Sequence, residues 1–194
     1  MPEATAQIGP TASPLWARAV RLCVLLLLAG ALVLTVVDSA RSWSAKRILA
    51  NAAQQAARVT VSNPLNVKNC RTATPCPVQW AAAAAQQSLI QAGVVQAACI
   101  DPERPNFSGV LIWVFSCDGS SMCNASDSTV CVKVDMTPVS RAENGEWIPF
   151  TRVTVQCPHE WELTAVLKLL PGKPTGPFPK SVSASALLRN FSAS

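Results

Sequence analysis

The residues best suited to chemistry in this 194-residue chain are its eight cysteines. Cys23 lies inside an apolar segment near the N-terminus, and all the others follow that segment. None of them forms a Cys-x-x-Cys pair, and the chain has a single histidine. Because a structural zinc site needs four clustered Cys or His ligands, we interpret the cysteines as disulfide partners in an oxidising compartment. A chain with all thiols reduced is the alternative.

The predicted disulfides each join neighbouring elements and are Cys117–Cys131, Cys70–Cys76 and Cys99–Cys157. The first would close the loop between two predicted strands, contributing about 3 kcal/mol for a loop of roughly 15 residues. The second would close the loop between two helices, and the third would tie the second helix to the sheet. Seven cysteines follow the apolar segment, and an odd number leaves one of them free or bridged between chains. In the predicted pairing this one is Cys123. Other pairings, such as Cys117–Cys123, remain open.

Enzymatic chemistry finds little support in the remaining side chains. His159 lies in a Cys-Pro-His-Glu run, and any Ser-His-Asp or Cys-His pair would have to use it. A lone histidine in such a run is typical of a surface residue. The acidic residues are scattered, and no glycine-rich phosphate loop is present. We therefore expect no enzymatic activity, no cofactor and no metal site.

The apolar segment before the cysteines, Leu22–Val37, has no charged residue. It is about 24 Å long as a helix, or about 28 Å when extended to Ala40, close to the roughly 30 Å hydrocarbon core of a bilayer. Its many Leu and Val residues favour membrane insertion. Two alternatives remain open, namely a buried core helix and a signal peptide cleaved near Val37-Asp38-Ser39.

Residues typical of the membrane interface flank this segment. Trp16 and Trp43 would lie about 40 Å apart on one helix, which matches the distance between the two headgroup layers. The expected interface residues are Trp16, Arg21, Asp38, Arg41 and Trp43. Basic residues lie on both sides of the segment, so charge does not set the orientation. The cysteines instead predict an extracytoplasmic C-terminal domain.

Beyond the anchor, the pattern predicts two helices followed by strands. A stalk helix continues to residue 61 and ends at Asn63-Pro64, and Val78–Ala98 reads as a second helix that Gly93 weakens. The expected strands have alternating or continuous apolar residues and are Val110–Phe115, Thr129–Met136, Phe150–Cys157 and Ser181–Arg189. Helices followed by strands predict an α+β fold with an antiparallel sheet of about four strands.

The expected organisation has three parts. Residues 1–14 form a disordered cytoplasmic tail, residues 15–62 a transmembrane and stalk helix, and residues 63–194 an extracytoplasmic α+β domain. The net charge of +5 is spread without a run of Lys or Arg. This distribution is unlike a nucleic-acid-binding patch, so we expect no nucleic-acid partner.

Three short motifs carry a family resemblance. Val36–Arg41 (VVDSAR) joins two aliphatic residues, an acid, two further residues and an arginine, while Leu49–Arg58 (LANAAQQAAR) has an Asn-Ala-Ala start and an Ala-Ala-Arg end. Val182–Arg189 (VSASALLR) is an alternating strand. Together they resemble the TadE-like minor pilin (pseudopilin) family of the bacterial tight-adherence, or Tad/Flp, pilus system. The resemblance covers most of residues 20–190.

The resemblance implies a pilin-like fold and a single-pass protein of the bacterial inner membrane. It implies a non-enzymatic component of pilus assembly whose partners are the lipid bilayer and other pilus or pseudopilin subunits, bound through the N-terminal helix and the head. The alternative is an anchored or secreted cell-envelope binding protein unrelated to pili. One feature departs from the family, because no acid lies between Glu3 and Asp38, where pilin precursors usually carry a glutamate after the peptidase site. We therefore expect an uncleaved anchor.

Overall fold

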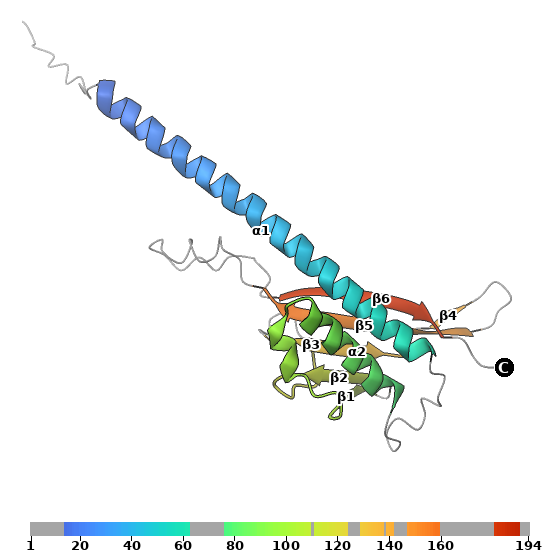
Figure 1. Cartoon of the computed structure of the whole chain (residues 1–194). Coiled ribbons are helices and arrows are strands. Elements are labelled where there is room, and N and C mark those ends of the chain that lie inside the picture. The colour runs from blue at the N-terminus through green and yellow to red at the C-terminus, as the bar shows by residue number, and fades with distance from the viewer. Residues whose placement is uncertain are drawn as a thin grey trace, which may run out of the picture.

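The computed structural model describes residues 14–62, 76–109, 111–123, 129–137, 139–141, 147–159 and 181–190. Its helices are α1 (Pro14–Ser62), α2 (Pro77–Gln91) and the short 3₁₀ helix η2 (Val95–Cys99). Its strands are β1 (Asn106–Gly109), β2 (Ile112–Ser116), β3 (Cys131–Asp135), β4 (Val139–Arg141), β5 (Trp147–Pro158) and β6 (Ser181–Arg189). One long helix runs into a head made of a second helix and a sheet (Figure 1), which confirms the predicted α+β class.

The sheet is antiparallel throughout its described pairs, and its main strands lie in the order β1-β2-β3-β5-β6. The short β4 pairs with the first residues of β5. The β4–β5 pairing is shifted by one residue relative to the β3–β5 pairing. The prediction of about four strands was therefore too low. It missed β1 and β4, which are only 4 and 3 residues long, too short to show an alternating pattern.

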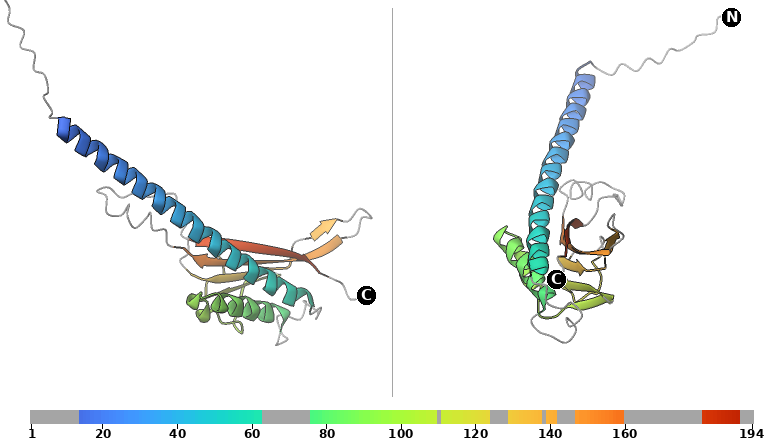
Figure 2. Two further views of the ribbon diagram at one scale, coloured as in Figure 1. Left: turned by 45° about the horizontal axis from the view of Figure 1, so that its top comes forward. Right: turned by 90° about the vertical axis from the view of Figure 1, so that its right-hand side faces the viewer.

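Both helices lie on the same face of the sheet (Figure 2). Alternate residues of the strands point toward the helices, as the sequence pattern predicted. These residues are fully buried in one core and include Val132, Val134, Val153 and Val155. Trp113 and Phe115 of β2 fill the same core. The helices contribute mainly alanines, whose small side chains let the helix backbones approach the sheet closely.

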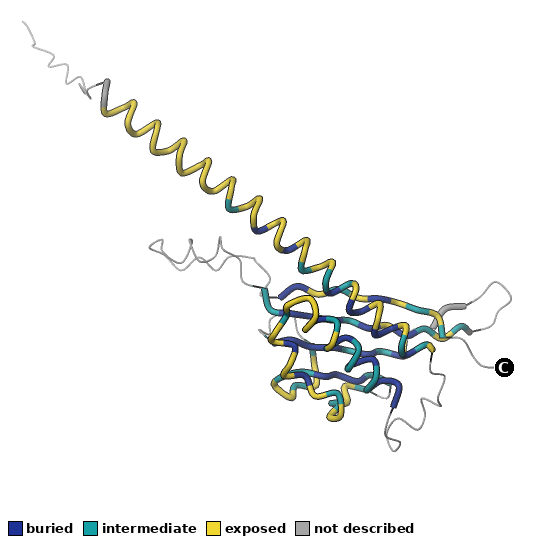
Figure 3. The backbone as a smooth tube through the Cα atoms, in the orientation of Figure 1, coloured by how far each residue is buried: buried dark blue, intermediate teal, exposed yellow. Residues whose placement is uncertain are grey.

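The second half of α1 is an integral part of this core. Leu49, Ala52, Ala53, Ala56 and Ala57 are at most 1% exposed, while the first half of the helix is exposed (Figure 3). The expected stalk is therefore also one of the two helices that cover the sheet. Residues 1–13 of the expected tail lie outside the described residues.

The second helix is shorter than expected, because a glycine ends it. Gly93 adopts φ of +89°, and its N–H donates to the carbonyl of Ile90, while the N–H of Val94 donates to that of Leu89. A glycine with positive φ is a common helix stop. The last residues of the predicted helix, Val95 to Ala98, belong instead to η2.

Candidate functional site

The first candidate site is the exposed apolar half of α1. One helix in the described chain is long and apolar enough to cross a membrane, and none of its apolar window is buried by the rest of the protein. The leucines Leu26, Leu27 and Leu28 are each more than 60% exposed. Such largely exposed leucines around a helix are unfavourable in water, so this half requires a lipid or protein environment.

Two tryptophans mark the ends of this segment. Trp16 and Trp43 are 66% and 61% exposed, and each lies about 20 Å from the middle of Leu22–Val37 along the helix axis. This position corresponds to the headgroup layers of a bilayer about 40–45 Å thick. The guanidinium of Arg47 lies over the Trp43 ring, 3.8 Å from its centroid. The two expected basic interface residues, Arg21 and Arg41, are exposed; Arg47 was not among the expected ones.

Burial along α1 begins just after the apolar segment. Asp38 is 3% exposed and Ser42 is 9% exposed, and both lie on the side of α1 that continues into the buried stripe of Leu49 and Ala53. Asp38, expected at the membrane boundary, therefore faces protein. The part of α1 that belongs to the core of the head begins at Ile48 and Leu49.

The cysteines form disulfides, but not the expected ones. The observed bridges are Cys99–Cys117 and Cys123–Cys131, while Cys23 and Cys157 are free. The predictions Cys117–Cys131 and Cys99–Cys157, and an unpaired Cys123, were therefore wrong. Cys76 is disulfide-bonded. Its predicted partner, Cys70, lies outside the described residues.

The register of β2 and β3 explains the corrected pairing. Ser116 lies opposite Cys131, and the N–H of Cys117 donates to the carbonyl of Val130. Since neighbouring side chains alternate between the two faces of a strand pair, Cys117 and Cys131 point to opposite faces of the sheet. Cys117 is therefore on the helix side, where it reaches Cys99 of η2. Cys131 is on the far side, where it reaches Cys123.

The segment that carries Cys123 folds over this far side. The hydroxyl of Ser116 donates to the carbonyl of Ser120 at 2.9 Å, and the side-chain amide of Asn106 donates to the same oxygen at 3.4 Å. The N–H of Ser120 donates to the carboxylate of Asp118, which lowers the pKa of that carboxyl. These contacts and the Cys123–Cys131 bridge tie the segment to β1, β2 and β3.

Cys157 is a buried thiol in the core beneath the helices. It follows Val155 on the helix-covered face of β5 and is 8% exposed. Burial raises its pKa to about 11, so the reactive thiolate is scarce at neutral pH. Cys157 is therefore a packing residue in this structure.

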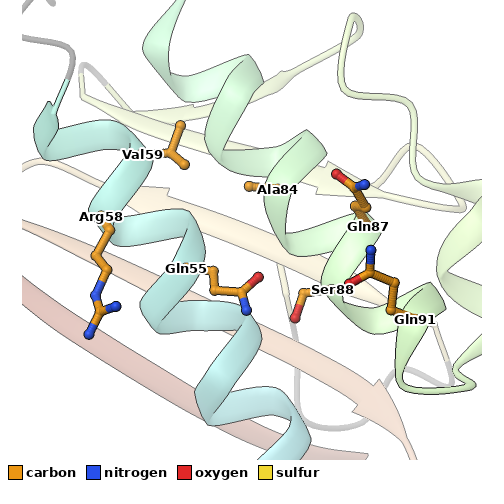
Figure 4. Close-up of a pocket in the computed structure, with 7 residues that line it drawn as sticks. All are labelled: Gln55, Arg58, Val59, Ala84, Gln87, Ser88 and Gln91. Carbon is orange, nitrogen blue, oxygen red and sulfur yellow. The ribbon is translucent and has the colours of Figure 1, made fainter.

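An open groove lies between α1 and α2 on the outer side of the head (Figure 4). It has a volume of about 380 Å³ and is lined by Gln55, Arg58, Val59, Ala84, Gln87, Ser88 and Gln91. Gln55, Gln87 and Gln91 give this groove, here called the amide groove, three side-chain amides, whereas the Arg58 guanidinium points away from α2 (Figure 4). Sequence reasoning missed this groove, although Gln87 and Gln91 have the spacing of one helix face. Such a surface can exchange hydrogen bonds with a polar partner.

A metal site has no candidate ligand cluster in the part of the chain that the structure describes. Among those residues, no three His, Cys, Asp or Glu side chains are close enough to hold a metal ion. His159 is partly exposed at the end of β5. The amide groove and the apolar half of α1 are therefore the main candidate sites.

No family model, curated protein or solved structure matches this chain. The conclusion about this protein therefore depends on the features of its own chain. The single candidate transmembrane helix in the described chain continues into a head that contains disulfides. The chain has the features of a membrane-anchored protein whose head folds in an oxidising compartment.

Proposed function

We propose that this protein is a pseudopilin-like component of a Tad/Flp pilus assembly machine, without enzymatic activity. It is anchored in the bacterial inner membrane by α1, with its head on the extracytoplasmic side. The observation that carries the proposal is the single helix Pro14–Ser62, which is exposed and apolar in its first half and packed on an antiparallel sheet in its second. The sequence motifs that resemble the TadE-like family lie on this helix and on β6.

The face of α1 opposite the core supports a role in helix–helix assembly. Its residues are all exposed and continue the apolar segment along one stripe, namely Ala40, Trp43, Arg47, Asn51, Gln54 and Arg58. A partner helix that packs against α1 in the bilayer can follow this stripe outward. It would then meet the amide groove beside α2, where polar side chains offer hydrogen bonds.

The proposal includes an uncleaved anchor. The apolar segment lacks the acidic residue that usually follows the peptidase site of pilin-like precursors, so α1 would remain a permanent membrane helix. Mass spectrometry of the purified full-length protein tests this point. A mature chain that starts near Gly9 or Pro10 contradicts it.

Site-specific photo-crosslinking in the native host tests the assembly role. A photoreactive residue at Asn51, on the exposed stripe, should capture a pilus-assembly subunit. The same residue at Ser183, which is exposed on β6, serves as the matched control. Deletion of the gene should reduce the number of surface pili, and the wild-type gene should restore it. Normal piliation after deletion, together with no pilus subunit at Asn51, refutes the proposal.

The amide groove favours one alternative, an anchored envelope protein that binds a polar ligand unrelated to pili. In that case a photoreactive residue at Gln87 captures a component outside the pilus machine. Piliation would then be unchanged in the deletion strain. The same strains therefore separate the two functions.

A further inference from the structure

The outer face of α1 next to the membrane carries two cations beside an exposed tryptophan. We propose that Trp43, Lys46 and Arg47, here called the collar, bind the phosphate of an anionic phospholipid in the leaflet that faces the head. The inference depends only on membrane insertion of α1 and not on a role in pili. It rests on three features of the collar. These are its depth in the membrane, the position of the Arg47 guanidinium over the Trp43 ring, and the lack of an acidic partner for Lys46 and Arg47 among the described residues.

The depth of the collar follows from the apolar segment. Trp43 lies about 20 Å from the middle of that segment along the helix. The hydrocarbon core ends about 15 Å from the bilayer middle, and the headgroup layer ends at about 20–22 Å. A helix tilt of about 20° changes this depth by only about 1 Å. The Trp43 ring therefore lies at the level of the lipid headgroups.

Arg47 lies one turn farther out, but its side chain leads back toward the membrane. Side chains on a helix lean toward its N-terminus, and the Arg47 guanidinium is 3.8 Å from the Trp43 ring centroid. The positive charge is thus held at the depth of Trp43. A guanidinium stacked on a ring keeps its in-plane N–H groups available, and these match the oxygens of a phosphate.

The two cations have no acidic partner on the described part of the chain. Neither Lys46 nor Arg47 forms an ion pair there, whereas Arg104 in the head pairs with Asp101 at 3.5 Å. The nearest acid on the helix, Asp38, is only 3% exposed. Both cations are exposed. A membrane phosphate supplies the missing negative charge at this depth.

The chain offers a matched control on the same helix. Arg58 is exposed and lies on the same stripe as Arg47, but about 16 Å farther from the membrane. This separation exceeds the Debye length of about 10 Å at 0.1 M salt. A cation at position 58 therefore adds little attraction to the bilayer surface.

The test uses the full-length protein in phosphatidylcholine bilayers with about 20% phosphatidylglycerol, an anionic lipid. Electron paramagnetic resonance of spin-labelled lipids measures the association of phosphatidylglycerol with the protein relative to phosphatidylcholine. We expect Arg47→Gln to lower this relative association by about fivefold, and Lys46→Gln to lower it by a similar factor. Arg47→Lys should retain most of it, and Arg58→Gln should leave it unchanged. Circular dichroism verifies that every variant is folded.

The outcomes of this experiment are distinct. Loss of phosphatidylglycerol preference in Arg47→Gln but not in Arg58→Gln supports the collar. Equal losses in both variants indicate general attraction by a basic protein and overturn the proposal. No preference in the wild-type protein, or no change in Arg47→Gln, overturns it as well.

Discussion

Replacing Ala53 with leucine tests whether the second half of α1 is built into the head. Ala53 is 0% exposed, and its neighbours Ala52, Ala56 and Ala57 are equally buried. A leucine adds three carbon atoms at a position with no open space. In a free stalk helix the same change is nearly neutral, because leucine and alanine have similar helix propensities.

The size of the effect follows from the close packing. Added methylene groups in a packed core force shifts of side chains and backbone that cost about 1–3 kcal/mol. For a head of roughly 150 residues, each kcal/mol lowers the melting temperature by about 2–4 °C. We therefore expect Ala53→Leu to lower the melting temperature by about 4–8 °C for a cost near 2 kcal/mol. Ala40→Leu, the same change at an exposed position of α1, is the control.

The assay is thermal unfolding of the full-length protein in detergent, followed by near-ultraviolet circular dichroism of the tryptophans in the head. Trp113, which is 2% exposed in the core, reports on loss of tertiary packing. Equal melting temperatures for Ala53→Leu, Ala40→Leu and the wild type would refute the packing of α1 on the sheet. A loss confined to Ala53→Leu supports it.

Three further predictions concern the head. Replacing both Cys99 and Cys117 with serine should lower the free energy of unfolding by about 3 kcal/mol in a denaturant titration, since the bridge spans 18 residues; an unchanged midpoint contradicts this pairing. Cys157 should resist maleimide at about pH 8 until the protein is denatured. Burial raises the pKa of the Cys157 thiol from 9.0 to about 11 in the folded protein. The stability that the neutral thiol contributes is therefore complete below pH 9 and declines as the pH rises toward 11. A Cys157→Ala variant should lack this decline. Gly93→Ala should destabilise the head by about 1 kcal/mol in thermal unfolding, because φ there is +89°, whereas Gly30→Ala in the anchor should not destabilise it.

Much of the fold was readable from local pattern. The uncharged apolar run predicted the anchor, and the alternating strand Ser181–Arg189 has the predicted bounds. The continuous apolar run that contains Trp113, Val114 and Phe115 was predicted as a strand, and these three residues lie in β2 and are buried. These features depend on residues close in sequence, whose periodicity of two or of about 3.6 shows directly in the chain.

Other features depended on which segments meet in space. Cys117 and Cys131 looked like partners because they bracket one loop, but the register of β2 and β3 directs them to opposite faces. Asp38 looked like a boundary residue, yet it is buried in the folded protein. The sequence by itself determined a membrane anchor, two helices and the faces of the main strands. Only the tertiary structure decided the disulfide pairs, the amide groove and the place of α1 in the core, because these depend on strand register and on contacts between distant segments.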